Sequence, residues 1–100
     1  MSGFRICDNK GFHVTFANGW TVSVQFGGGN YCDNYDFPIG KERDRRVMES
    51  SNAEVAHWGP DHELRPFEEG DTVKGYCTPE MVLELLQQCA AMPITEKVKP

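Results

Sequence analysis

The stretch that decides the fold is Phe12-His13-Val14-Thr15-Phe16-Ala17-Asn18-Gly19-Trp20-Thr21-Val22-Ser23-Val24-Gln25-Phe26. Apolar and polar residues alternate on both sides of Asn18-Gly19, which is typical of two β-strands joined in a hairpin. A two-residue loop at Asn18-Gly19 would pair Phe16 with Thr21 and mix apolar and polar side chains on one face. A three-residue loop over 17–19, with Gly19 in the left-handed conformation of a G1 bulge, keeps the faces separate. The pairs that follow are Phe16 with Trp20, Val14 with Val22 and Phe12 with Val24.

The segment before this hairpin, Phe4-Arg5-Ile6-Cys7-Asp8, alternates in the same way. If Asn9-Lys10-Gly11 forms a second three-residue loop, Asp8 pairs with Phe12, Ile6 with Val14 and Phe4 with Phe16. Both turns then produce an antiparallel meander with one apolar face, which needs a cover, and one polar face. The apolar face collects Phe4, Ile6, Phe12, Val14, Phe16, Trp20, Val22, Val24 and Phe26. The polar face carries Arg5, Cys7, His13, Thr15, Thr21, Ser23 and Gln25.

The C-terminal part of the chain predicts a helix that covers the apolar face of the sheet. Thr78 before Pro79 is typical of a helix N-cap with proline at the first helical position, and Pro93 ends the helix. The apolar stripe at helical spacing is Val82, Leu85, Leu86 and Cys89. Residues 53–58, 63–67 and 71–77 predict two or three further strands, and 63–67 is an edge strand or no regular strand because Pro66 lacks an N–H.

We therefore expect a single α+β domain over residues 1–100. Its antiparallel β-sheet consists of an N-terminal three-strand meander plus two or three further strands, and a C-terminal helix covers one face. A long loop over 27–52 interrupts the strands, and 94–100 form a mobile tail.

Composition excludes several classes of protein. Asp and Glu number 15 against 10 Lys and Arg, which gives a net charge of −5 and argues against direct nucleic-acid binding. The first twenty residues contain Arg5, Asp8 and Lys10 and no apolar run, so we expect no secretory signal and no membrane span. An even number of cysteines is compatible with a disulfide framework, but without a signal we expect four reduced thiols in a cytoplasmic protein.

The long loop is where we expect function. Two tyrosines and a phenylalanine alternate with Asn and Asp between Asn30 and Phe37, as in many recognition loops. The alternative is an Ω-loop whose aromatic side chains pack back on the sheet. Gly27-Gly28-Gly29 is not a phosphate-binding loop, because neither a lysine nor a helix follows at the required spacing. The candidate contacts in the loop are Tyr31, Asp33, Tyr35 and Asp36.

Two charged segments follow. Lys41-Glu42-Arg43-Asp44-Arg45-Arg46, within a possible helical turn from Gly40 to Met48, is either a solvated surface or an arginine cluster that contacts a phosphate or an acidic partner. Residues 54–71 carry six acidic residues against Arg65 alone. They form either a solvated hairpin or an acidic patch that imitates phosphates and occupies a basic groove. The candidate contacts here are Arg43, Arg45, Arg46, Asp61, Glu63, Glu68 and Glu69.

Metal and nucleophile sites have weak support in the sequence. The possible ligands show neither C-x-x-C nor H-x-x-x-H spacing; they are Cys7, Cys32, Cys77, Cys89, His13, His57 and His62. Cys32 with His13 or His57 is the only Cys–His combination outside the expected core, and no oxyanion element accompanies it. We therefore expect no catalytic residue, no metal and no cofactor, while a metal site assembled from distant positions stays open.

Three stretches carry a resemblance: Phe12–Phe26 with the continuation into Gly-Gly-Gly-Asn-Tyr-Cys-Asp-Asn, Asn52–Trp58, and Val73–Glu80. Together they resemble short uncharacterised accessory proteins of tailed bacteriophages, a family that brings no active site. This chain has Gly59-Pro60-Asp61-His62 where the related pattern places a glycine turn, which leaves the form of that hairpin open. The resemblance implies a phage product in the cytoplasm of an infected bacterium. Small acidic phage proteins often block a host factor, including CRISPR complexes.

Three hypotheses of function follow. The leading one is a non-enzymatic protein-binding module that inhibits a bacterial host or defence protein through the loop and acidic contacts named above. The second is a small-molecule binder, such as a nucleotide-sequestering homodimer that uses Tyr31, Tyr35 and the arginines. The third is a thiol- or metal-dependent enzyme.

Overall fold

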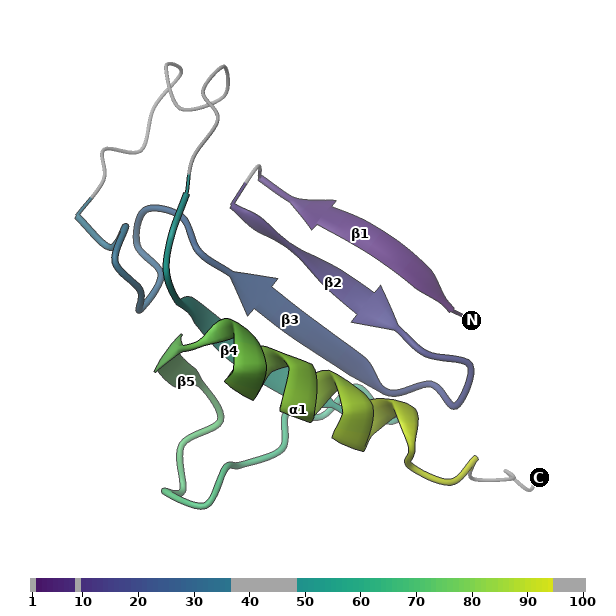
Figure 1. The fold of residues 1–100 in the computed structure, drawn as a ribbon. Helices are drawn as coiled ribbons and strands as arrows, with labels where there is room; N and C mark the ends of the chain where they lie inside the picture. Colours follow the sequence, from purple (N-terminus) through teal and green to yellow (C-terminus); the bar gives the residue numbers. More distant parts are fainter. Residues whose placement is uncertain (1, 9, 37–48, 95–100) are drawn as a thin grey trace.

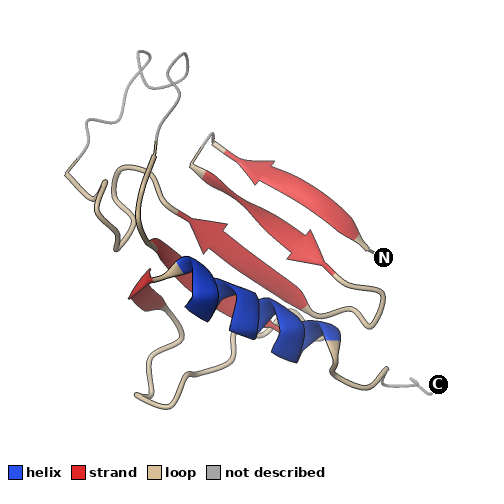
Figure 2. Cartoon of the chain, viewed as in Figure 1, coloured by secondary structure: helices blue, strands red, loops and turns tan. Residues whose placement is uncertain are grey.

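Five antiparallel strands form one sheet in the order β1-β2-β3-β4-β5, and a C-terminal helix packs against it (Figures 1 and 2). The structure is a computed structural model that describes residues 2–8, 10–36 and 49–94. The elements are β1 (Gly3–Cys7), β2 (Gly11–Thr15), β3 (Thr21–Gln25), β4 (Ala53–Trp58), β5 (Lys74–Cys77) and α1 (Pro79–Ala90). The predicted α+β fold is confirmed.

The hairpin of β2 and β3 has the predicted register. Phe12 lies opposite Val24, and Val14 lies opposite Val22. The N–H of Phe16 donates to the carbonyl of Trp20 at 2.8 Å, and Gly19 closes the loop with a φ of 89°. This is the three-residue loop that keeps the apolar side chains on one face.

The register between β1 and β2 differs from the prediction by two residues. Ile6 lies opposite Phe12 and Phe4 opposite Val14, instead of Val14 and Phe16. The predicted pairing of Asp8 with Phe12 is wrong for the same reason: the turn comes one residue earlier and leaves Gly11 inside β2. A Cβ at Gly11 would collide with the carbonyl oxygen of Val24, so glycine is needed in the strand rather than in the turn. The faces are unchanged, because a shift of two residues preserves them.

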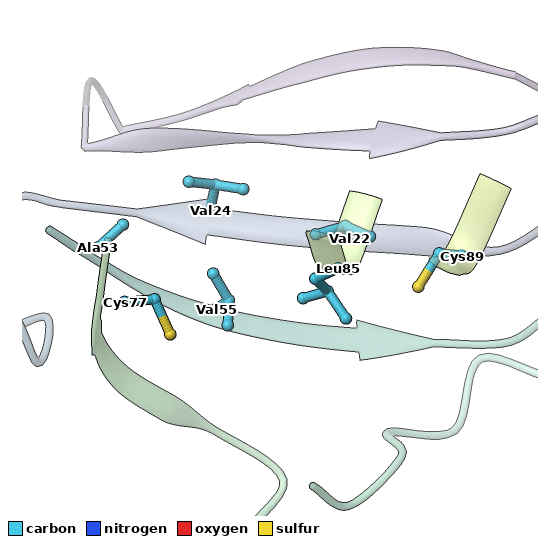
Figure 3. Packing of buried hydrophobic residues seen from close by; sticks show 7 residues of the cluster. All are labelled: Val22, Val24, Ala53, Val55, Cys77, Leu85 and Cys89. Atoms are coloured by element: carbon cyan, nitrogen blue, oxygen red, sulfur yellow. The ribbon is translucent and has the colours of Figure 1, made fainter. Parts of the chain in front are cut away.

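The helix begins as predicted. The hydroxyl of Thr78 accepts a hydrogen bond from the N–H of Met81 at 3.2 Å, and Pro79 opens the first turn. Leu85 and Cys89 face the sheet and are buried. The helix ends at Ala90, three residues before Pro93. Figure 3 shows the resulting core, which consists of Val22, Val24, Ala53, Val55, Cys77, Leu85 and Cys89.

The end of the helix is fastened by a buried side chain from the β2–β3 turn. The amide nitrogen of Asn18 donates to the carbonyl of Cys89 at 2.9 Å and to the carbonyl of Met92 at 2.8 Å. Its amide oxygen accepts from the N–H of Trp20 at 2.9 Å. Carbonyls at a helix C-terminus have no partner within the helix, so Asn18 satisfies them and fixes α1 on the sheet.

The helix covers only part of the apolar face. It contacts β3, β4 and β5, and Figure 1 shows β1 lying beyond it. Phe4 and Ile6 are 82% and 78% exposed, so the prediction that they are covered is wrong. The hairpin places Val14, Phe16, Trp20 and Val22 on the face to be covered, and we expect all four to be buried; Val22 is, whereas the other three are half-buried. An α-helix is about 10 Å wide and strands are about 4.8 Å apart, so one helix cannot cover five strands.

The second half of the sheet is shorter than predicted. Residues 63–67 form no strand; Leu64 makes only an isolated bridge with Trp58, which fits the missing donor of Pro66. The last strand starts at Lys74 instead of residue 71. The possible helical turn over 40–48 and residues 95–100 of the tail lie outside the described residues. In the part of the chain that is described, no helix has both the length and the hydropathy needed to cross a membrane.

Replacing Asn18 with Asp is expected to lower the free energy of unfolding by about 3 kcal/mol, because a carboxylate cannot donate to the helix carbonyls and is repelled by them. Urea unfolding measures the loss. The matched control is Gln87→Glu, which makes the same charge change at an exposed position in the last turn. Equal stability of the two variants would contradict the fastening role of Asn18.

Candidate functional site

The loop after β3 is held in place by two asparagine side chains. Asn30 is buried; its amide oxygen accepts from the N–H of Gly27 at 3.1 Å, and its nitrogen donates to Glu54 at 3.1 Å. Asn34 donates to the carbonyls of Phe26 at 2.8 Å and Glu49 at 3.0 Å. These bonds tie the loop to the end of β3 and to the segment that leads into β4.

Asp33 connects the same loop to the start of β4. Its N–H donates to the side-chain oxygen of Asn52 at 2.8 Å, and Asn52 donates back to the carboxylate at 3.2 Å. The hydroxyl of Ser51 donates to the other carboxylate oxygen at 3.0 Å. Asp33 was predicted as a partner contact, and its geometry gives it a positioning role within the loop.

Tyr31 and Tyr35 of this loop form a stacked pair, and Tyr76 of β5 is hydrogen-bonded to the backbone of Tyr31; we call these three residues the tyrosine surface. The rings of Tyr31 and Tyr35 stack with centroids 5.6 Å apart and an interplanar angle of 11°. The three residues are 52%, 44% and 55% exposed, and the sequence contains no other tyrosine. Tyr31 and Tyr35 thus keep about half of their surface exposed, although the Cβ of Tyr31 lies against Gly75 of β5, so the Ω-loop alternative stays open.

Tyr76 joins the surface through its backbone and was not singled out from the sequence. Its N–H donates to the carbonyl of Tyr31 at 2.9 Å, and its φ is 56°, a conformation that non-glycine residues rarely adopt. Such strained residues concentrate at functional sites. The sequence signal that could have identified this position is Gly75, a glycine inside a strand. An added Cβ at Gly75 would meet the Cβ of Tyr31 at 2.5 Å.

The predicted acidic contacts are divided between two places. The turn with Asp61 and Glu63 follows the end of β4. The loop after β3, which carries Tyr31 and Tyr35, is instead attached to the beginning of β4 through Asn52. Asp61 binds Arg65 through both oxygens at 3.1 Å, and these bonds, helped by the N–H of Glu63, hold the pKa of Asp61 below its usual range. The structure thus does not unite this turn with the tyrosine surface.

Glu68 and Glu69 lie in the turn before β5. The carboxylate of Glu69 is 3.6 Å from the ammonium group of Lys74; the Glu69 side chain is mostly exposed and that of Lys74 is partly buried. Glu68 borders a hollow beside Lys74 and Glu84 of the helix. Of the remaining candidates, Asp36 is exposed, and Arg43, Arg45 and Arg46 lie outside the described residues.

The proposed Cys–His combinations have other contacts. Cys32 is buried and its Sγ donates to the carbonyl of Gly27 at 3.7 Å. His13 makes an edge contact with Trp58, on the polar face, and His57 packs 4.8 Å from Phe67 on the helix side. Burial, with a smaller contribution from Arg65, lowers the pKa of His57 and so favours its neutral form. Among the described residues, no group of three His, Cys, Asp or Glu side chains is arranged to hold a metal ion.

Comparison of the chain with protein-family models, curated proteins and solved structures gave no match.

The four thiols, which are all free, are expected to react very unequally with a thiol reagent. Burial raises the pKa of Cys89 to about 11, so at pH 8 only about one molecule in a thousand carries its thiolate. Burial also raises the pKa of Cys77. We expect Cys7, at the end of the uncovered strand, to be labelled first and the other three only after unfolding.

Mass spectrometry of the labelled protein in buffer and in guanidinium measures the difference. A Cys7→Ser variant is the control and should lose the fast label. Rapid labelling of Cys32 in the folded chain would instead favour the thiol-enzyme hypothesis.

Proposed function

We propose that this chain is a non-enzymatic protein-binding module that docks its partner on the tyrosine surface. The observation that carries the proposal is the stacked, half-exposed pair of Tyr31 and Tyr35, with the half-exposed Tyr76 hydrogen-bonded beside it through its backbone. Tyrosine is enriched at the energetic centres of protein interfaces, because it buries a large area and loses few rotamers.

The preorganisation of the loop supports this proposal. The stacked rings of Tyr31 and Tyr35 stand on a loop fixed by the side chains of Asn30, Asn34 and Asp33. A partner would therefore not have to order the loop, which removes an entropic cost of binding. The close stacking also argues against a nucleotide held between Tyr31 and Tyr35, since a third ring cannot enter between them without separating the pair.

The partner that we propose is a bacterial host or defence protein, and the proposed setting is the cytoplasm of an infected cell. The resemblance to short proteins of tailed bacteriophages supports this, and binding would inhibit the partner by occupying its surface. The net charge of −5 favours a partner with a basic surface, because long-range attraction accelerates the association of oppositely charged proteins.

Tyr31→Ala and Tyr35→Ala are expected to speed dissociation of the partner about tenfold, which corresponds to about 1.4 kcal/mol each. The partner is first captured from bacterial lysate and identified by mass spectrometry, and the rates are then measured by surface plasmon resonance with purified proteins. Leu64→Ala is the matched control, since it removes an exposed apolar side chain at the other end of β4. Thermal melting checks that each variant is folded. Folded tyrosine variants that dissociate like the parent would refute the proposal.

Reversing Glu68 and Glu69 to Lys is expected to change a different rate. Exposed charges outside the contact area act mainly on encounter, so association should slow while dissociation changes little. The association rate of the variant should also depend less on salt. The association rates of parent and variant should become equal at high ionic strength, where screening removes the attraction. An effect confined to dissociation would place these carboxylates in direct contact with the partner.

A further inference from the structure

The polar face of the sheet contains a hollow that none of the contacts above uses. Gly3, Thr15, Thr21 and Trp58 lie in one row across β1, β2, β3 and β4. The two threonines are small and Trp58 at the end of the row is large, so the middle of the row is depressed. The cavity measures about 380 Å³, which is within the range of small-molecule sites.

Basic side chains gather at this hollow, although the chain as a whole is acidic. Arg5 and His13 lie opposite each other on β1 and β2, and His62 reaches the hollow from the turn after β4. None of the described residues that line it is acidic. Asp61, the residue before His62, has its carboxylate bound to Arg65. The hollow thus concentrates hydrogen-bond donors that suit an anion.

The walls of the hollow are held by contacts within the protein. The hydroxyls of Thr15 and Thr21 are hydrogen-bonded at 2.8 Å, and the ring of Trp58 meets His13 edge-on with centroids 5.0 Å apart. His62 has a φ of 67°, so the turn places its imidazole at the cost of a strained backbone. Such strain is common at ligand-binding positions.

We propose that this hollow binds a small phosphomonoester that carries a flat aromatic ring, the class to which nucleoside monophosphates belong. Arg5 binds the phosphate oxygens through its planar guanidinium group, and His13 and His62 add donors beside it. The hydroxyl pair of Thr15 and Thr21 forms the floor. Trp58 provides the aromatic contact for the ring. This site lies at the end of β4 away from the tyrosine surface, so it is independent of the proposed docking of a protein.

The chemistry of His13 gives the binding a pH dependence. Burial, and then the positive charge of Arg5, lowers the pKa of His13, which favours the neutral ring in the empty hollow. A phosphate dianion beside the ring favours its protonated form and opposes the effect of Arg5. Arg5 is the charged residue that acts on His13, and His62 lines the same hollow; Cys7 lies on the same face of β1, while Thr15, Thr21 and Trp58 are neutral. Affinity should therefore rise as the pH falls from 8 towards 6.5, while the phosphate is still largely dianionic.

Isothermal titration calorimetry with the whole chain tests the proposal. The probes are adenosine and uridine 5′-monophosphate, adenosine without phosphate, and inorganic phosphate, each at pH 6.5 and pH 8. Arg5→Gln should weaken the better monophosphate about tenfold, the loss expected for one charged hydrogen-bonding group. Lys74→Gln is the matched control, because it removes a positive charge on β5, at the opposite edge of the sheet, and should leave the affinity unchanged.

Two further variants separate the roles of the histidines. His62→Asn removes the imidazole but keeps a residue that tolerates a positive φ, and it should weaken binding without unfolding the turn. His13→Gln should flatten the pH dependence. A Trp20→Phe background leaves Trp58 as the sole tryptophan, so quenching of its fluorescence by the monophosphate reports directly on the hollow.

The proposal is supported if a monophosphate binds more tightly than adenosine and inorganic phosphate do. Arg5→Gln must then weaken this binding about tenfold, and Lys74→Gln must leave it unchanged. Equal binding of adenosine would overturn the phosphate contact, and equal binding of inorganic phosphate would overturn the ring contact. Absence of heat and of fluorescence change with every probe at millimolar concentration would reject the site.

Discussion

The hydrogen bonds of the Asn18 side chain join two parts of the fold that are more than 70 residues apart in the sequence. They connect the β2–β3 turn to carbonyls at the end of α1 and just beyond it, and the buried core lies between the helix and the sheet. A core of seven small and medium-sized side chains offers little redundancy, so the position of the helix has to be fixed by direct bonds. Since the helix is fixed over β3, β4 and β5, the uncovered position of β1 follows from the same constraint.

The sequence predicted those features that depend on neighbouring residues. The alternation around Asn18-Gly19 was sufficient for the β2–β3 register, and Thr78-Pro79 was sufficient for the start of the helix. The prediction of the β1–β2 register was wrong because two turn positions satisfy the alternation equally well. Only the approach of β3 to Gly11 distinguishes them, and that contact is not visible in the pattern of one hairpin.

The candidate sites show the same division. The polar loop singled out Tyr31 and Tyr35 but left their exposure open, whereas Tyr76 comes from another strand and joins them only through the fold. The acidic segment looked continuous in the sequence, whereas Asp61 lies in the turn after β4 and Glu68 in the turn before β5. The polar hollow had no sequence signal, since its residues come from four strands and a turn and its depth is due to two threonines beside a tryptophan.

The Asn18-Gly19 dipeptide also bears on the chemical lifetime of the chain. In Asn-Gly sequences the glycine nitrogen readily attacks the asparagine amide, expels ammonia and, after hydrolysis, leaves an acid. In the folded protein both reacting groups are occupied, because the Asn18 amide is bound to helix carbonyls and the Gly19 N–H donates to Phe16 at 2.8 Å. Deamidation therefore requires the turn to open, and a chain that has reacted carries an acid where the helix needs a donor. The fraction of deamidated chains after storage would thus depend on how often the turn opens.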